Sequence, residues 1–405
     1  MNPRTNPDST DLSLADYRWL LGDEAESWLS RVAEGGETSP AVAARLRREL
    51  SAERTHLVLQ QAELRRRAIG KFSKADQMFF SPLGLEQASD EIVARHKAKR
   101  FEPHGPRADL CCGIGGDALS LAADGPTVCV ERDPALALMA GANLRVYERS
   151  RAEVVSGDAT RLKLDAETSW HIDPDRRPEG HRTTDVRYHS PNRMAIEELL
   201  AEAPHGAIKL APATVVPAAW ARQAELQWIG RDRQCRQQVA WFGRLCKQPG
   251  TRRATVLQGR PGDDRHESRS VTGAPGKPTD FAERPGRYIF EPDAAVMAAD
   301  LSGSLAADHA LAALSRDGGY LTGDISIDDP MMSRFEVEEV LPFDRKRIRQ
   351  LLSSRGIGSL EIKKRGVAEQ PEQLRRKLRL KGPNSAVLIL ARPATSTLAI
   401  LAHRQ

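Results

Sequence analysis

The apolar positions in the first hundred residues follow a helical pattern. Residues 41–69 contain no glycine or proline, and Val42, Leu46 and Leu50 recur on a loose helical period among dense arginine and glutamate. This pattern predicts helices with one apolar stripe and one solvated, charged face. Residues 1–100 are therefore predicted to form an N-terminal helical region.

Beyond Arg107 the pattern changes to short apolar runs that alternate with helical segments, which is typical of βαβ units. The helix between the first two strands is expected to begin near Asp117, because a carboxylate stabilises a helix N-terminus. Two later runs, Glu225–Ile229 and Arg253–Leu257, are expected to form an antiparallel end of the sheet. Residues 101–258 thus predict an α/β domain with a Rossmann-like sheet. Its first five strands are predicted at Ala108–Cys112, Thr127–Glu131, Glu153–Ser156, Trp170–Ile172 and Ala207–Leu210.

Residues 259–286 are rich in Gly, Pro, Asp, Ser and Arg and can bury little apolar surface, which predicts a flexible linker or insert. Periodic patterns resume at Tyr288. Residues 287–405 are predicted to form a small α+β domain. Its predicted helices are Arg345–Arg355 and Pro371–Leu380, and its predicted strands are Ser359–Lys363, Ala386–Ala391 and Ala399–His403.

The charge along the chain is uneven. The net charge of +5 is modest, but Leu341–Gln405 holds 15 Lys and Arg against 4 Asp and Glu, a local charge of +11. The remainder carries −6. A basic C-terminal segment on a mildly acidic body indicates an anionic partner for that segment, and nucleic acid is the first candidate.

Composition excludes several classes of protein. A hydrophobic content of 40% with 28% charged residues is typical of a globular protein. The start MNPRTNPDST has no apolar signal region, and the most apolar late stretch, Ala386–Ala402, is interrupted by Arg392 and Pro393. Five cysteines, an odd number with no zinc-like spacing, favour reduced thiols. The expectation is a soluble cytoplasmic protein without membrane span or metal site.

The most informative local sequence is Asp109–Asp117, DLCCGIGGD, which ends a predicted strand and opens a helix. Its glycines allow the backbone to approach a ligand closely, and the helix N-terminus offers free N–H groups. Gly113-x-Gly115-x-x-Ala118 also fits the dinucleotide fingerprint of dehydrogenases, with Glu131 where a ribose-binding acid belongs. Taken alone, this glycine pattern does not establish a dinucleotide site.

Three acids favour a site for a methionine-bearing nucleotide over a pyrophosphate. Asp109 would repel a pyrophosphate but can accept a hydrogen bond from an amino group. Asp158 follows the third strand, where an adenine amino group could be recognised, although it could equally cap a helix. Asp173 lies in an Asp-Pro turn after the fourth strand, although such pairs also form plain turns. Because ligands collect at the carboxyl ends of an open α/β sheet, these acids and Glu131 are expected around one cleft.

In order, DLCCGIGGD, VCVERDP, VVSGDA and IDPDRR resemble motifs I to IV of class I S-adenosylmethionine (SAM)-dependent methyltransferases. The first motif and the stretch KFSKADQMFFSPLGLEQAS are similar to those of trimethylguanosine-synthase-like RNA methyltransferases. The layout, ending in FDRKRIRQLLSSRGIGSLEIKKRGV, resembles bacterial methyltransferases with a THUMP-like C-terminal domain. The resemblance covers roughly residues 55–405.

The resemblance implies a role for each matching residue. Glu131 would hold the ribose hydroxyls of SAM, Asp158 its adenine, and Asp173, with Pro174, would orient the acceptor beside the methyl group. The run Asp173-Pro174-Asp175-Arg176 lacks the aromatic residue of the amino-methyltransferase motif, so Arg176 is the candidate to stack on a base or grip a phosphate. Whether Arg176 and Arg177 touch substrate or pair with Asp175 stays open. The methionine end of SAM would be lined by Asp109, Cys111, Gly113, Gly115 and Asp117.

THUMP-type domains are associated with RNA, so the basic tail is expected to bind RNA, although it could also be a solvated surface. The leading hypothesis is an RNA base methyltransferase with nitrogen as the favoured acceptor. A small-molecule methyltransferase and a non-catalytic RNA-binding protein with a structural Rossmann domain are the alternatives. The candidate RNA-binding residues are Lys363, Lys364, Arg365, Arg375, Arg376 and Lys377.

Overall fold

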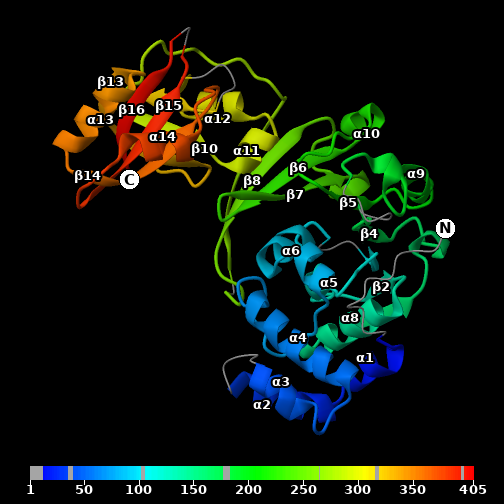
Figure 1. Cartoon of the computed structure of the whole chain (residues 1–405). Helices are drawn as coiled ribbons and strands as arrows, with labels where there is room; N and C mark the ends of the chain where they lie inside the picture. The colour runs from blue at the N-terminus through cyan, green and yellow to red at the C-terminus, as the bar shows by residue number, and fades with distance from the viewer. Residues whose placement is uncertain are drawn as a thin grey trace, which may run out of the picture.

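The computed structural model describes residues 12–34, 40–101, 105–176, 183–263, 265–314, 319–393 and 396–405. The helices of residues 14–68 and the C-terminal module lie at opposite ends of the molecule, with the larger sheet between them (Figure 1). The helical segment predicted in residues 41–69 contains two helices, because residues 47–51 form a turn and Ser51 starts the second by accepting a hydrogen bond from Arg54 N. The N-terminal helices are α1 (Leu14–Leu20), α2 (Asp23–Glu34), α3 (Pro40–Leu46), α4 (Ala52–Ala68), α5 (Pro82–Gln87) and α6 (Glu91–Ala98).

Within the described ranges the larger sheet has nine strands in the order β3-β2-β1-β4-β5-β7-β6-β8-β9. Strands β1 to β5 are parallel, and β4 lies on the opposite side of β1 from β2. The order therefore reverses between β1 and β4, which is where open α/β sheets bind ligands. These strands are β1 (Arg107–Leu110), β2 (Thr127–Glu131), β3 (Ala152–Ser156), β4 (Ser169–Ile172) and β5 (Gly206–Leu210).

The far end of this sheet differs from the prediction. The two predicted strands, β6 and β8, pair parallel to each other, and the antiparallel strand is β7, which separates β5 from β6. Strand β9 lies inside the segment predicted to be a flexible linker and pairs antiparallel with β8, so the sheet extends to Gly273. The bounds are β6 (Glu225–Arg231), β7 (Gln234–Trp241), β8 (Arg252–Gln258) and β9 (Glu267–Gly273).

Helices cover both faces of the larger sheet. Apolar residues of α6, such as Ile92 and Val93, pack with Ile229 and Trp241 on one face. The other face packs against α9, α10 and the C-terminal elements in a separate core. Helices α1, α2 and α4 pack against α8 near the loop that follows β1. The covering helices are α7 (Ala118–Leu121), α8 (Pro134–Val146), α9 (Arg193–Glu202) and α10 (Ala218–Gln223), with short 3-10 turns η1 (Ala159–Arg161), η2 (Val186–Tyr188) and η3 (Gly243–Leu245).

The second sheet has seven strands in the described part of the chain, in the order β11-β12-β10-β13-β16-β15-β14. The helices and strands predicted after residue 340 are all present, within a few residues at each end. The strands are β10 (Tyr288–Pro292), β11 (Ala312–Ala313), β12 (Leu321–Gly323), β13 (Met332–Pro342), β14 (Ile357–Lys364), β15 (Asn384–Ala391) and β16 (Leu398–Arg404); the helices are α11 (Ala294–Ala298), α12 (Ser302–Asp308), α13 (Arg345–Ser354) and α14 (Pro371–Leu378).

One apolar core joins the two sheets. Trp228 of β6 and Val256 of β8 belong to the same buried cluster as Val296 of α11, Leu305 of α12 and Phe290 of β10. The C-terminal module is therefore packed directly on the larger sheet. None of the helices in the described ranges combines the length and apolar character needed to cross a membrane.

Candidate active site

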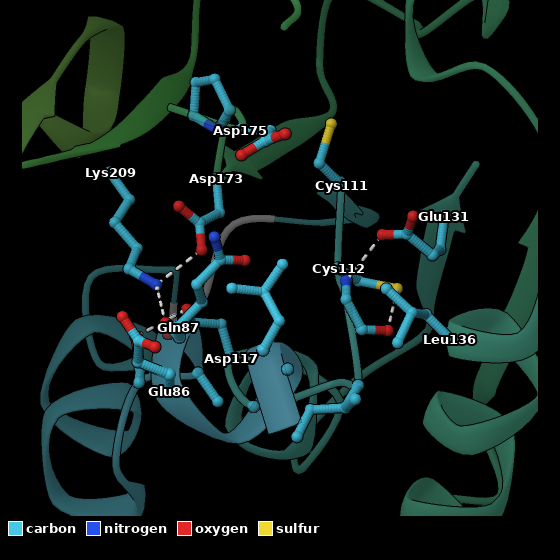
Figure 2. Close-up of a pocket in the computed structure, with 18 of the residues that line it drawn as sticks. Glu86, Gln87, Cys111, Cys112, Asp117, Glu131, Leu136, Asp173, Asp175 and Lys209 are labelled. Carbon is cyan, nitrogen blue, oxygen red and sulfur yellow. Dashed lines mark hydrogen bonds and ion pairs between the residues drawn. The ribbon is translucent and has the colours of Figure 1, made fainter. Parts of the chain in front are cut away.

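A cavity of about 970 Å³ lies at the carboxyl ends of the parallel strands, next to the switch between β1 and β4. Its walls come from the loops after β1, β2, β3, β4 and β5, from the α5–α6 segment and from the β6–β7 hairpin (Figure 2). Nine of the ten residues predicted for the cofactor and for catalysis line this one space: Asp109, Cys111, Gly113, Asp117, Glu131, Asp158, Asp173, Pro174 and Arg176.

The loop after β1 bends sharply over the floor of this cavity. Cys111 has φ +58° and Gly113 has φ +57°, in the left-handed region that glycine adopts without strain. A Cβ on Gly113 would meet no atom within 4 Å, so the backbone there borders open space. Gly115 does not line the cavity. It packs against Ala140 of α8, which a Cβ would approach to 3.5 Å.

Asp109 is held by a histidine from the neighbouring strand. Its Oδ1 lies 2.7 Å from Nδ1 of His171, and both side chains are almost completely buried. Its other oxygen, Oδ2, is buried without a hydrogen-bond partner among the described residues. Burial raises the pKa of Asp109, while the hydrogen bond from His171 opposes that shift. A buried carboxylate oxygen without a donor is costly, which indicates a ligand donor at this point.

The helix begins at Asp117 as predicted, since this residue is the N-cap of α7, but its side chain makes no capping hydrogen bond. The carboxylate turns instead to Lys97 of α6, whose Nζ lies 2.6 Å from Oδ1, and accepts a hydrogen bond from Ser89. Burial alone would raise the pKa of Asp117, but attraction by Lys97 and His171 outweighs it and lowers that pKa. Lys97 also lies 3.2 Å from His171 Nε2. A buried polar network therefore lies beneath the β1 and β4 loops.

Glu131 at the end of β2 braces the glycine loop. Its Oε2 accepts a hydrogen bond of 2.8 Å from Gly113 N, and its Oε1 accepts one of 2.9 Å from Asp133 N. Figure 2 shows the carboxylate beside this loop, facing the same cavity as Asp173. Each carboxylate oxygen keeps acceptor capacity for a hydroxyl group.

Asp158 has a structural role as well as a place in the cavity. Its Oδ1 accepts hydrogen bonds from Thr160 N and Thr160 Oγ1, which caps the 3-10 turn η1. These hydrogen bonds lower the pKa of Asp158. The capping alternative weighed for the sequence is therefore present in the structure, and the carboxylate still borders the cavity.

Asp173 after β4 forms an ion pair that the sequence did not suggest. Its Oδ2 lies 2.6 Å from Nζ of Lys209 on β5, and Lys209 also donates to the carbonyl of Gln87, as Figure 2 shows. Arg176 borders the cavity, while Arg177 lies outside the described residues. Asp175 pairs with Ser190 through two backbone hydrogen bonds, which fixes the turn.

The cysteines do not offer a nucleophile. Burial, followed by the neighbouring Glu131 and Asp173, raises the pKa of the Cys111 thiol, and burial raises that of Cys112 well above its ordinary value. Both thiols are thus protonated near neutral pH, and the thiolate is the nucleophilic form. The five cysteines, all within the described ranges, form no disulfide. Those same ranges contain no group of three or more His, Cys, Asp or Glu placed to hold a metal ion.

The predicted RNA-binding residues differ in exposure. Lys363, Lys364 and Arg365 are half-buried. Lys363 lies 2.7 Å from Glu291 Oε2 and Arg365 lies 3.9 Å from the other oxygen of Glu291, so these two cations share one carboxylate. The three basic residues on α14 are exposed, as are four on the neighbouring α13. The first set is Arg375, Arg376 and Lys377, and the second is Arg345, Lys346, Arg347 and Arg349.

Three lysines of the site were missed in the sequence. Lys209 lies in the strand GAIKL and Lys97 on the largely buried helix α6, so the available signal was a lysine among apolar neighbours in each segment. Lys71 donates to the carbonyls of Leu85, Glu86 and Ala88, and burial together with repulsion by Lys209 lowers its pKa to about 8. Nothing in the spacing of these lysines predicted that they would meet.

The strand order and the acid-lined cavity at the switch point define a class I methyltransferase fold. Over 372 residues the chain is 31% identical to an uncharacterized S-adenosylmethionine-dependent methyltransferase of Mycobacterium tuberculosis strain H37Rv, covering 85% of this chain and 95% of that protein. The protein of strain CDC 1551 / Oshkosh matches equally. The chain belongs to the SAM-dependent methyltransferases, and SAM is its methyl donor.

Two further comparisons concern the ends of the chain and the whole fold. Residues 332–404 match a family described as THUMP domain-like, and residues 11–68 match a domain of unknown function (DUF8688). A crystal structure of a methyltransferase candidate from Porphyromonas gingivalis W83 superposes with a TM-score of 0.69 at 17% identity, covering 96% of this chain and 98% of that one. This similarity shows that the fold is shared along nearly the full length.

Proposed function

We propose that this methyltransferase modifies a base in RNA and that nitrogen is the acceptor atom. The observation that carries the proposal is the single cavity that brings the Asp173-Pro174 turn next to Asp109 and Glu131. The THUMP domain-like match and the basic helices of the same region support RNA as the substrate. In a methyltransferase that acts on small molecules, this basic module would have no role.

The residues present fit SAM. Asp109 Oδ2, buried and lacking a donor among the described residues, would accept a hydrogen bond from the amino group of the methionine part. Glu131 would accept hydrogen bonds from the ribose hydroxyls, and Asp158 would face the adenine amino group. The open space over Gly113 and Gly157, where a Cβ would meet no atom within 4 Å, leaves room for the nucleotide.

Bound SAM supplies an electrophilic methyl group whose sulfur leaves as a neutral thioether, so the protein's task is alignment. The free oxygen of Asp173, Oδ1, would accept a hydrogen bond from the attacking amine and direct its lone pair toward the methyl carbon. Pro174 would fix the turn, and Arg176 at the cavity wall would contact the base or its phosphate. Preorganised dipoles of this kind act most strongly in a site from which water is excluded.

An exposed aromatic residue lies near the turn of residues 173–176 after β4, which is called the catalytic turn below. Tyr188 on η2 is 63% exposed, and its near neighbour Ser190 pairs with Asp175 through the backbone. The turn itself lacks the aromatic residue on which amino-methyltransferases stack the target base. Tyr188 is therefore the candidate for that stacking surface.

The basic face of α13 and α14 would hold the RNA backbone. Its arginines and lysines are exposed, whereas Lys363 and Arg365 on the sheet are occupied by Glu291. Phosphate contacts release counterions, so binding through them weakens as salt increases. The exposure of these side chains favours the helices over the sheet edge for the proposed RNA contact.

Transfer of tritium from labelled SAM to total RNA from cells lacking the gene tests the proposal. Label that is lost after ribonuclease treatment and found in a methylated base by mass spectrometry supports it. Label that stays with small molecules, or no label in RNA at all, would overturn it.

Replacing Arg375, Arg376 and Lys377 by alanine should reduce the slope of log affinity against log salt by about 2–3. The exposed triple Arg45, Arg47 and Arg48 is the matched control.

A further inference from the structure

Lys209 joins three parts of the cavity at one nitrogen. The residue lies near the end of β5, and its Nζ is 2.6 Å from Asp173 Oδ2 after β4 and 2.9 Å from the Gln87 carbonyl at the end of α5. Its side chain is 12% exposed, while that of Asp173 is 30% exposed. Asp173 therefore has one oxygen fixed by the protein and one side that faces the cavity.

The end of α5 is fixed by a second lysine as well. A helix leaves its last carbonyls without partners, and these must be satisfied by other donors. Lys71 takes the carbonyls of Leu85, Glu86 and Ala88, and Lys209 takes the remaining one, that of Gln87. Lys209 is the one of these two lysines that also reaches a carboxylate of the catalytic turn.

The charges around the pair keep Lys209 protonated. Burial disfavours its charge, but attraction by Asp173 and Asp117 outweighs burial and raises the pKa of Lys209. It therefore acts as a hydrogen-bond donor and cannot accept a proton from the substrate near neutral pH. Other charged or titratable groups surround the Lys209–Asp173 pair on the neighbouring elements. They are Lys71, Lys97, Asp109, Cys111, Arg176 and His189.

We propose that Lys209 is a positioning residue that fixes the orientation of the Asp173 carboxylate, and that it links the catalytic turn to the α5–α6 segment. The inference rests on the proposed role of Asp173 in orienting the acceptor. Because the ion pair is neutral as a whole, Asp173 offers direction to an uncharged acceptor amine rather than a strong bare charge. Removing the cation would leave the carboxylate free to rotate.

The test uses three full-length variants and two measurements. Lys209→Met removes the cation at similar length, Lys209→Arg retains it, and Lys74→Met is the control. Lys74 lies in the same segment before the sheet and also donates to a carbonyl, that of Val146, but does not border the cavity. The first measurement is the crystal structure of each variant, which gives the orientation of the Asp173 carboxylate.

In Lys209→Met the Asp173 carboxylate should turn away from β5 or show more than one orientation, because the donor that holds its Oδ2 is gone. Lys209→Arg and Lys74→Met should keep the carboxylate in its wild-type orientation. A carboxylate in Lys209→Met that superposes on that of the wild type would overturn the inference. This measurement needs no substrate, so it remains decisive even if RNA is not the acceptor.

The second measurement is methyl transfer to total RNA from cells lacking the gene. In Lys209→Met the maximum rate should fall by about 100-fold, since a misplaced catalytic group costs about that factor, while the affinity for SAM is retained. Lys209→Arg should recover most of the rate, because it keeps a donor for Asp173. If the carboxylate moves but the wild type transfers no methyl to RNA, the proposed function fails and the ion-pair role stands. If RNA is methylated and Lys209→Met matches the wild type in rate, the positioning role fails alone.

Discussion

Replacing Asp109 by asparagine tests the proposed SAM site most directly. Asparagine has the same shape and can still accept the hydrogen bond from His171, so the buried pair is retained in part. The change converts the donor-free oxygen, Oδ2, into an amide nitrogen or removes its negative charge. A protonated amino group in the site then loses its charged acceptor. We expect the affinity for SAM to fall, with little effect on the rest of the cavity.

The magnitude follows from the type of hydrogen bond that is lost. A hydrogen bond to a charged group contributes about 1.5–3 kcal/mol. Because about 1.4 kcal/mol corresponds to a factor of ten, the Kd for SAM should rise by about 10- to 150-fold. Methylthioadenosine has the same nucleoside but no amino acid part, so its affinity should not change. The contrast between the two ligands isolates the amino group from any general loosening of the loop.

Isothermal titration calorimetry with both ligands measures this contrast. Asp293→Asn is the matched control, because Asp293 is an equally buried aspartate that caps α11 and does not border the cavity. An unchanged Kd for SAM in a folded Asp109→Asn variant would refute the assignment. Equal losses for SAM and methylthioadenosine would instead indicate that Asp109 supports the loop rather than the ligand.

Three further outcomes are expected. Asp173→Ala should retain SAM affinity and lose turnover by about 100-fold; equal loss of both in calorimetry and rate assays would assign Asp173 to cofactor binding or folding. Tyr188→Ala should lower kcat/KM for RNA while Tyr188→Phe retains it, and equal rates for both variants would remove the stacking role. Burial lowers the pKa of His96 to about 3, so the unfolded chain alone takes up a proton as pH falls below about 6.5; stability should drop by about 2 kcal/mol from pH 7 to pH 5. Urea unfolding of His96→Gln should lack most of that drop, and an identical drop would contradict the assignment.

The central part of the fold could be predicted from the sequence because its strands are short apolar runs separated by glycine and acidic turns. Strand β2 has the predicted bounds, and β1, β3, β4 and β5 differ by one or two residues. Strand β7 was missed because it begins with polar residues, Gln234-Cys235-Arg236, before its buried half. Strand β9 was missed for a related reason, since it is a largely exposed edge strand in a segment of low apolar content.

The sequence predicts which acids line the site but not which cations pair with them. Glycine and aspartate at strand ends mark positions along the chain, and the sheet brings those ends together. The partners of the acids come from elsewhere: Lys97 from a helix before the sheet and Lys209 from a later strand. No local spacing encodes such contacts, because they depend on the packing of α6 against the sheet. The packing of Gly115 against Ala140 is hidden for the same reason, because α8 comes later in the chain.

The shared core of Trp228, Val296 and Phe290 makes the two sheets one solid body. A domain on a flexible linker can sample a wide range of positions. A domain that shares a buried core with the catalytic sheet instead keeps its binding surface at a constant distance from the active-site cavity. Selection of the modified nucleotide would then depend on which folded RNAs match that distance. Recognition of this kind depends on the shape of the RNA, so a short unstructured oligonucleotide with the correct sequence would be a poor substrate.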